Sequence, residues 1–98
     1  MADLKSFLAK SNCVLLDVRG RDEFADGHAP GSVNVPHTEI HDNLDKLPSN
    51  KATPICCYCA HGRRGGIAED ALKQLGYTQT LNGQKWHEVA AALEEVKK

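Results

Sequence analysis

Short apolar runs alternate with amphipathic stretches along the 98 residues of this chain. Two runs that are apolar at almost every position, residues 14–18 and 55–58, predict strands buried on both faces of a sheet. Shorter runs at 33–35 and 78–81 predict two further strands. Strands separated by amphipathic stretches favour an α/β domain built on a small, mainly parallel sheet.

Apolar residues spaced three and four positions apart predict the helices that separate these strands. The helical stretches are 4–8, a turn at 23–24, 40–47, 67–75 and 86–96. Asp3 is a candidate cap for the first helix. Glycines and prolines predict where the elements end. These boundary residues are Gly27, Pro36, Pro48, Pro54 and Gly76.

Length and composition are typical of one globular domain, spanning residues 1–98, with 41% hydrophobic and 26% charged residues. A net charge of −1 lacks the basic excess that nucleic acids and anionic membranes attract, so neither is an expected partner. No apolar run approaches the roughly 20 residues that cross a bilayer. The first seven residues contain an acid and lack the apolar core of a secretory signal. We therefore expect a cytoplasmic protein.

The chain has four cysteines, and three of them fall within four consecutive positions of one predicted strand. They are Cys13, Cys56, Cys57 and Cys59. Because neighbours on a strand face opposite sides, reduced thiols are favoured over a disulfide scaffold. Cys56 and Cys59 have the C-x-x-C spacing of some zinc and redox sites, but no second ligand pair matches them and we expect no metal.

The segment 59–64, Cys-Ala-His-Gly-Arg-Arg, links a buried strand to an amphipathic helix. A cysteine in this position meets backbone N–H groups and the positive end of the helix dipole, which stabilise an anion at the sulfur. Gly62 lets the backbone curl, and two arginines add positive charge. Ligands bind beyond the carboxyl ends of parallel strands, so the 17–19 segment should face the same site. Cys59 is the candidate nucleophile; the alternative is a buried, inert cysteine.

Several motifs resemble the rhodanese family in content and order. At the front they are Asp17-Val18-Arg19, Glu23-Phe24, Gly27-His28-Ala29, Pro30-Gly31-Ser32 and Asn34-Val35-Pro36. The 59–64 segment is similar to the family's six-residue active-site loop, and 81–83 with Trp86 resembles its closing Gly-rich turn and tryptophan. The resemblance implies a three-layer domain with helices on both faces of the sheet, and a single-domain thiosulfate sulfurtransferase. Two positions depart from the pattern: Gly65 replaces the usual Ser or Thr, and Asn82 replaces a common Gly.

The resemblance also implies roles for individual residues. Cys59 accepts a sulfane sulfur from a small anionic donor and passes it to cyanide or a thiol, including a protein thiol, without a cofactor. The implied substrate-binding residues are Ala60, His61, Gly62, Arg63, Arg64 and Gly65. The implied supporting residues are Asp17, Arg19 and Glu23. Arg64 is expected to pair with Asp17 or Glu23, which leaves Arg63 for the substrate, while His61 shapes the mouth of the pocket.

Two other functions use similar loops. Cysteine phosphatases and arsenate reductases resemble C-x5-R, whereas Cys59 to Arg64 is C-x4-R, and Tyr58 replaces the His that often precedes the nucleophile. The shorter loop favours a reacting sulfur over the larger tetrahedral phosphate. A persulfide or polysulfide carrier that delivers sulfur to a partner protein would use the same loop, so the sequence leaves this alternative open.

Overall fold

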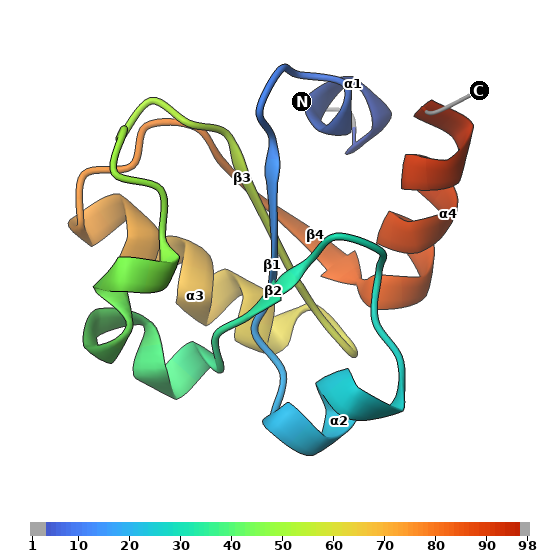
Figure 1. The fold of residues 1–98 in the computed structure, drawn as a ribbon, viewed down its shortest axis with the longest axis horizontal. Helices are drawn as coiled ribbons and strands as arrows, with labels where there is room; N and C mark the ends of the chain where they lie inside the picture. Colours follow the sequence, from blue (N-terminus) through green and yellow to red (C-terminus); the bar gives the residue numbers. More distant parts are fainter. Residues whose placement is uncertain (1–3, 97–98) are drawn as a thin grey trace.

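The computed structural model describes residues 4–96, and its centre is a parallel four-stranded sheet (Figure 1). The strands are β1 (Val14–Asp17), β2 (Val33–Asn34), β3 (Ile55–Cys59) and β4 (Thr80–Lys85), in the order β2-β1-β3-β4. Every strand pair is parallel. The predicted α/β class and parallel sheet are confirmed.

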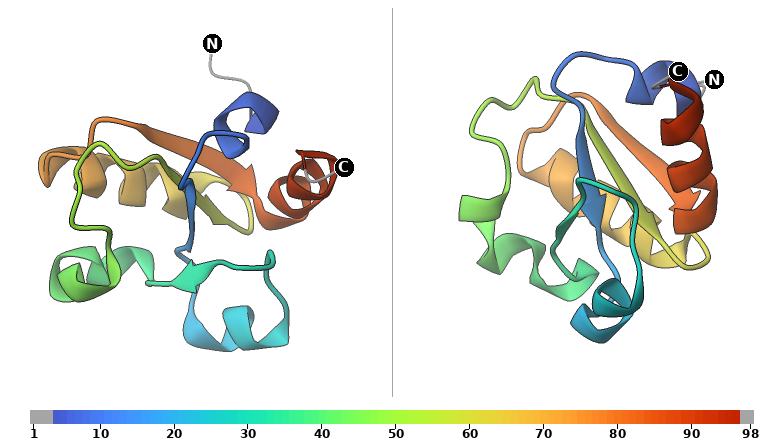
Figure 2. Two further views of the ribbon diagram at one scale, coloured as in Figure 1. Left: turned by 45° about the horizontal axis from the view of Figure 1, so that its top comes forward. Right: turned by 45° about the vertical axis from the view of Figure 1, so that its right-hand side comes forward.

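Helices cover both faces of this sheet (Figure 2). One layer holds α1 (Leu4–Leu8) and α4 (Trp86–Val96), which contact each other. The opposite layer holds α3 (Arg63–Gln74) with the 3-10 helices η1 (His37–Asp42) and η2 (Leu44–Lys46). Helix α2 (Arg21–Asp26) follows β1 and lies beyond the carboxyl ends of the strands. The three-layer arrangement predicted from the resemblance is present.

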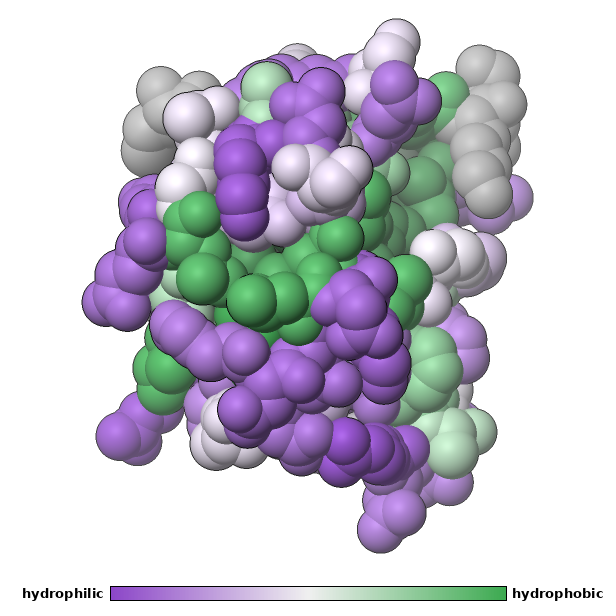
Figure 3. Space-filling model, turned by 60° about the vertical axis from the view of Figure 1, so that its left-hand side comes forward, coloured by the Kyte–Doolittle hydropathy of each residue, from purple (hydrophilic) through white to green (hydrophobic). Residues whose placement is uncertain are grey.

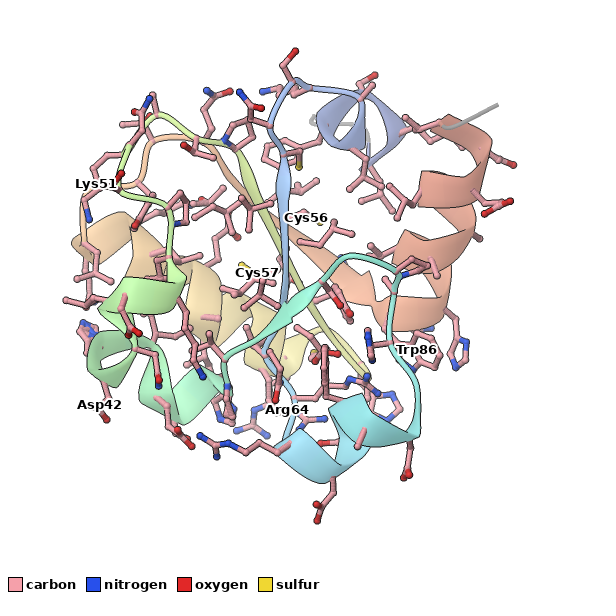
Figure 4. All side chains as sticks on the ribbon, viewed as in Figure 1. Asp42, Lys51, Cys56, Cys57, Arg64 and Trp86 are labelled. Atoms are coloured by element: carbon pink, nitrogen blue, oxygen red, sulfur yellow. The ribbon has the colours of Figure 1, made fainter. Side chains whose placement is uncertain are left out.

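Strand β3 is buried along its whole length and contributes to both cores. Cys57 and Cys59 pack in the core beneath α3, whereas Cys56 and Tyr58 pack in the core beneath α1 and α4. The alternation follows from the two-residue repeat of a strand, and it explains why this run is apolar at every position. Figure 4 shows Cys56 and Cys57 in the middle of the sheet. Cys56 and Cys59 thus face opposite sides of the sheet.

The single helix predicted over 40–47 is wrong, because η1 and η2 occupy this stretch. Asn43 between them has φ −129° and ψ 43°, outside the helical region. Its Nδ2 donates to the Glu39 carbonyl oxygen (2.9 Å), an acceptor that a continuous helix would use itself. Leu44 is 52% exposed and does not share the buried face of Ile40. Apolar residues spaced three apart are also compatible with 3-10 turns, and here these form.

The last strand begins and ends later than the predicted 78–81 segment. After Leu81, β4 pairs with β3 through polar residues, since Asn82 lies beside Cys57 and Lys85 beside Cys59. This register contains one extra residue on β4, a β-bulge, in which Gln84 has φ +69°. Backbone pairing rather than apolar content defines this end of the strand, so hydrophobic pattern did not reveal it.

Glycine positions agree better with the predicted boundaries. Gly76 follows α3 with φ +99°, and its N–H donates to the Lys73 carbonyl oxygen (3.0 Å), which confirms the predicted cap. Gly27 closes α2 with φ +153°. Asp3, the predicted cap of α1, lies outside the described residues.

The described surface carries a few exposed large apolar side chains. These are Val33, Leu44 and Ile67. On the face shown in Figure 3, a band of apolar side chains lies between two hydrophilic areas. None of the helices between residues 4 and 96 is long and apolar enough to cross a membrane.

Tyr58 ties the central strand to the turn after α2. Its hydroxyl donates to Ser32 Oγ (2.8 Å) and accepts from the Ala29 N–H (3.1 Å). Burial raises the pKa of Tyr58 to about 12, so the phenol stays neutral and able to donate.

We expect Tyr58→Phe to lower the free energy of unfolding by about 1–3 kcal/mol, because the buried Ala29 N–H loses its acceptor. Urea denaturation followed by circular dichroism measures this change. Equal stability of the two proteins would show that water or a shifted backbone satisfies Ala29 instead.

Candidate active site

The carboxyl ends of β1 and β3 bring together the two segments that the sequence singled out. Asp17 and Tyr58 are register partners, and one residue further on the Val18 N–H donates to the Tyr58 carbonyl oxygen (3.0 Å). The segment after β1 therefore lies beside the segment that begins at Cys59. Their predicted proximity is confirmed.

Cys59 is the last residue of β3, and its sulfur lies beneath the turn into α3. Its Sγ accepts from the Gly62 N–H (2.9 Å) and from the Gly65 N–H (3.4 Å). Gly62 precedes α3 with φ +99°, a conformation that favours glycine, as the sequence predicted. Cys59 is only 1% exposed. Two N–H donors and the positive end of a 12-residue helix thus converge on one sulfur.

The remaining loop positions differ in exposure. His61 and Arg63 are exposed, while Ala60 and Arg64 are partly buried. Within residues 4–96, no hydrogen bond uses the backbone N–H of Ala60, His61, Arg63 or Arg64. The Arg63 side chain likewise forms no ion pair with another described residue. The loop therefore keeps backbone donors and one guanidinium available for an anion.

Arg64 is held by a carboxylate on α2. Its two terminal nitrogens donate to Glu23 Oε1 (2.7 Å) and Oε2 (3.0 Å), in the two-pronged geometry typical of Arg–carboxylate pairs. Glu23 Oε1 also accepts from the Gly20 N–H (3.0 Å). The structure thus connects the start of α3 to the start of α2, with Glu23 and not Asp17 as the partner. Figure 4 shows Arg64 beside α2.

The Arg64 and Gly20 hydrogen bonds lower the pKa of Glu23 from 4.5 to about 2. Because the folded-state pKa is depressed, the pair stabilises the fold above about pH 4.5, and this contribution is lost as the pH falls toward 2. The Glu23 side chain is 40% exposed, so solvent screening limits the effect to about 1 kcal/mol or less.

We expect Glu23→Gln to flatten the dependence of stability on pH between about pH 4.5 and 2. Denaturant unfolding of both proteins at a series of pH values measures the difference. Parallel curves through that range would exclude Glu23 as a source of the dependence.

Asp17 and Arg19 form a buried pair that anchors the turn after α2. Arg19 Nε lies 3.1 Å from both carboxylate oxygens of Asp17, and Nη2 lies 2.8 Å from Oδ2. Nη2 also donates to the Gly27 carbonyl oxygen (2.5 Å), and the guanidinium lies 5.1 Å from the centre of the Trp86 ring. The hydrogen bonds to Asp17 raise the pKa of Arg19. Asp17 and Arg19, the supporting residues that the resemblance implies, thus pair with each other beside this turn.

His28 has a structural place in the same turn. Its Nδ1 donates to the Phe24 carbonyl oxygen (2.8 Å), and its ring stacks on the Phe24 ring at 3.7 Å between centres.

Other thiols are poor nucleophiles. Burial raises the pKa of Cys56 to about 12 and the pKa of Cys57 still further. Half-buried Cys13 also has a raised pKa, chiefly from desolvation. The Cys59 sulfur lies in a different setting, where it accepts two backbone N–H groups at the N-terminus of α3. The arrangement suits nucleophilic attack by a thiolate followed by stabilisation of an anionic product.

Sequence reasoning assigned no role to Asn82, which contacts the loop directly. Its Nδ2 donates to the Gly62 carbonyl oxygen (2.8 Å). The available signal was its departure from the rhodanese pattern, together with the departure at Gly65. Neither departure alone indicates a contact between Asn82 and a loop residue 20 positions earlier in the chain.

The chain is similar to known proteins over most of its length. Residues 1–84 match the model of a family described as the rhodanese-like domain. A thiosulfate sulfurtransferase of Escherichia coli K12, PspE, is 28% identical over 75 residues, covering 76% of this chain and 72% of that protein. A human thiosulfate:glutathione sulfurtransferase is 31% identical over 94 residues, covering 84% and 82%, respectively. The solved structure of a rhodanese with anions from E. coli has a TM-score of 0.74 and 27% identity, covering 80% of this chain and 92% of that one.

Proposed function

The chain belongs to the rhodanese-like domain family, and we propose that it transfers a sulfane sulfur through a persulfide on Cys59. The donor is thiosulfate or a similar small anion, and the acceptor is cyanide or a thiol, including a protein thiol. The observation that carries this proposal is the pair of backbone N–H donors, from Gly62 and Gly65, on the Cys59 sulfur. The names of the two relatives, both thiosulfate sulfurtransferases, support the same donor.

In the first step the Cys59 thiolate attacks the outer sulfur of thiosulfate. A new S–S bond forms between the two sulfurs, while the bond to the sulfonate sulfur breaks and its electron pair leaves with sulfite. Sulfite is a stable anion, so the leaving group needs no proton and no general acid is required. Negative charge passes from the Cys59 sulfur to the outer persulfide sulfur.

In the second step the acceptor attacks that outer sulfur. Cyanide becomes thiocyanate, or a thiolate becomes a persulfide, and the S–S bond electrons return to Cys59. The unused N–H groups of Ala60, His61, Arg63 and Arg64 are available to stabilise the displaced charge. Arg64 would contribute through its backbone, since Glu23 occupies its guanidinium.

We expect Arg63→Ala to raise the KM for thiosulfate by about tenfold, because a charge-assisted contact with the donor is lost. With a neutral organic trisulfide as the donor, the KM of the variant should change little. Steady-state rates with both donors measure the contrast, and Arg21→Ala serves as a control because Arg21 is already paired with Glu39. An equal loss with the neutral donor would remove Arg63 from donor recognition.

The persulfide itself is the direct test. Intact-mass spectrometry under non-reducing conditions, after incubation with thiosulfate, should show one added sulfur and one equivalent of released sulfite. Peptide mapping should locate the added sulfur on Cys59, with Cys13, Cys56 and Cys57 unmodified. An unchanged mass, or sulfur on another cysteine, would overturn the proposal.

The proposal extends to the setting of the reaction. Residues 1–98 act as one domain, without a cofactor or metal, and without a nucleic-acid or membrane partner. The four cysteines of the chain are all free thiols, which supports a reducing compartment such as the cytoplasm.

A further inference from the structure

The Asn82 side chain joins strand β4 to the loop that holds Cys59. Its Nδ2 donates to the Gly62 carbonyl oxygen (2.8 Å), while its Oδ1 accepts from the Gln84 N–H (2.9 Å). These partners determine the orientation of the amide, because the carbonyl can only accept and the N–H can only donate. One side chain therefore connects the loop to the β-bulge and also holds Gln84 at its φ of +69°.

Gly65 leaves the space that Asn82 occupies. A Cβ at Gly65 would lie 2.3 Å from Asn82 Oδ1 and 3.0 Å from its Cγ, well inside van der Waals contact. Any larger residue at position 65 would displace the Asn82 amide from its present place. The two departures from the rhodanese pattern are thus one coupled feature, in which a side chain at position 82 fills the space left empty at position 65.

Gly62 and Gly65, the two loop glycines described above, both donate to the Cys59 sulfur. The Gly62 N–H lies 2.9 Å and the Gly65 N–H 3.4 Å from Sγ. Glycine is the residue with the most conformational freedom, so two glycine donors in one turn need an external restraint to stay aligned. The Gly62 carbonyl oxygen receives two such restraints, from Asn82 and from the Gly66 N–H (3.1 Å).

We propose that Asn82 is a positioning residue, which holds Gly62 and Gly65 so that their N–H groups point at the Cys59 sulfur. It acts through the loop and touches no reacting atom. The inference rests on Cys59 as the nucleophile of the proposed sulfur transfer. Loss of the Asn82 bond should therefore weaken anion stabilisation as well as slow the reaction.

The test uses Asn82→Asp, which preserves shape but replaces the Nδ2 donor with an oxygen. We expect the pH midpoint of Cys59 alkylation by iodoacetamide to rise by at least about half a unit. The kcat for sulfur transfer from thiosulfate to cyanide should fall about tenfold, as expected for a misplaced site. Mass spectrometry of the Cys59 peptide follows the alkylation. Gln84→Glu is the matched control, because it adds the same charge to the same bulge at an exposed side chain and keeps the loop bond.

A second comparison separates positioning from stability. Gly65→Ala should displace Asn82, which lowers the unfolding midpoint and also shifts the alkylation profile. Adding Asn82→Gly removes the clash, so the double variant should regain stability while its alkylation profile stays shifted. If Asn82 had a purely structural role, the double variant would regain both the stability and the alkylation profile of the wild-type protein.

A wild-type alkylation profile in Asn82→Asp, or its return in the double variant, would overturn the inference. Alkylation requires no sulfur donor, so it reports on the loop even if no persulfide forms. Absence of a persulfide in the wild-type protein would instead count against the proposed function. The two failures are thereby distinguishable.

Discussion

Cys59→Ser is expected to reduce sulfur transfer from thiosulfate to cyanide by at least about 1000-fold. A serine hydroxyl is not ionised near neutral pH, so it lacks both the charge and the polarisability that attack on a sulfane sulfur needs. The fold should persist, because the serine oxygen can still accept the N–H groups of Gly62 and Gly65. The colorimetric determination of thiocyanate measures the rate, and thermal unfolding checks the fold.

Cys13→Ser is the matched control for this loss. It makes the same exchange at a half-buried thiol that lies outside the loop, and should keep nearly the full rate. If the two variants lost the rate of sulfur transfer to a similar extent, the cysteine-to-serine exchange would be acting by disturbing the fold. A Cys59→Ser protein that keeps more than about a tenth of the rate would require another nucleophile.

Asp17→Ala is expected to lower the free energy of unfolding by about 3–5 kcal/mol. Asp17 is fully buried and Arg19 only 5% exposed, so the substitution leaves a guanidinium that is buried without its carboxylate. The same guanidinium donates to the Gly27 carbonyl oxygen, so the turn after α2 should loosen with it. This cost is a large fraction of the stability of an ordinary domain, which totals about 5–15 kcal/mol.

Urea denaturation of Asp17→Ala beside Arg21→Ala provides the comparison. Arg21 forms a similar two-pronged pair with Glu39, but its side chain is 62% exposed, so its loss should cost far less stability than the loss of Asp17. If Asp17→Ala does not fold, Asp17→Asn retains an acceptor for Arg19 and should show an intermediate loss. Equal costs for the buried and the exposed pair would contradict the argument.

The parts of the fold that hydrophobic pattern predicts are those where burial decides the structure. β3 is one example, because both of its faces are covered and every position from Ile55 to Tyr58 had to be compatible with a core. The 40–47 stretch is the opposite case, since a side chain–backbone bond from Asn43 interrupts it locally. Polar β4 was misplaced for a third reason: its pairing with β3 depends on backbone groups, which carry no side-chain signal.

The candidate site divides in the same way. Cys59, Gly62 and the Arg64 pair could be anticipated, because a local turn and a short motif determine them. The choice of Glu23 over Asp17 as the partner of Arg64 required the position of α2. Asn82 required the bulge in β4 as well, and a bulge is invisible until the register of two strands is known.

The burial of Cys59 affects its thiol and its persulfide differently, because the two forms extend to different distances from the backbone. With 1% of the residue exposed, the empty thiol is shielded from bulky oxidants and from mixed-disulfide formation. Adding sulfur lengthens the side chain by one S–S bond, about 2 Å, and the outer atom then carries the reactivity. An acceptor molecule therefore meets the loaded protein more readily than the empty one. Because the Cys59 sulfur is buried, the protein would expose the transferred sulfur to the acceptor while it protects the thiol that receives this sulfur.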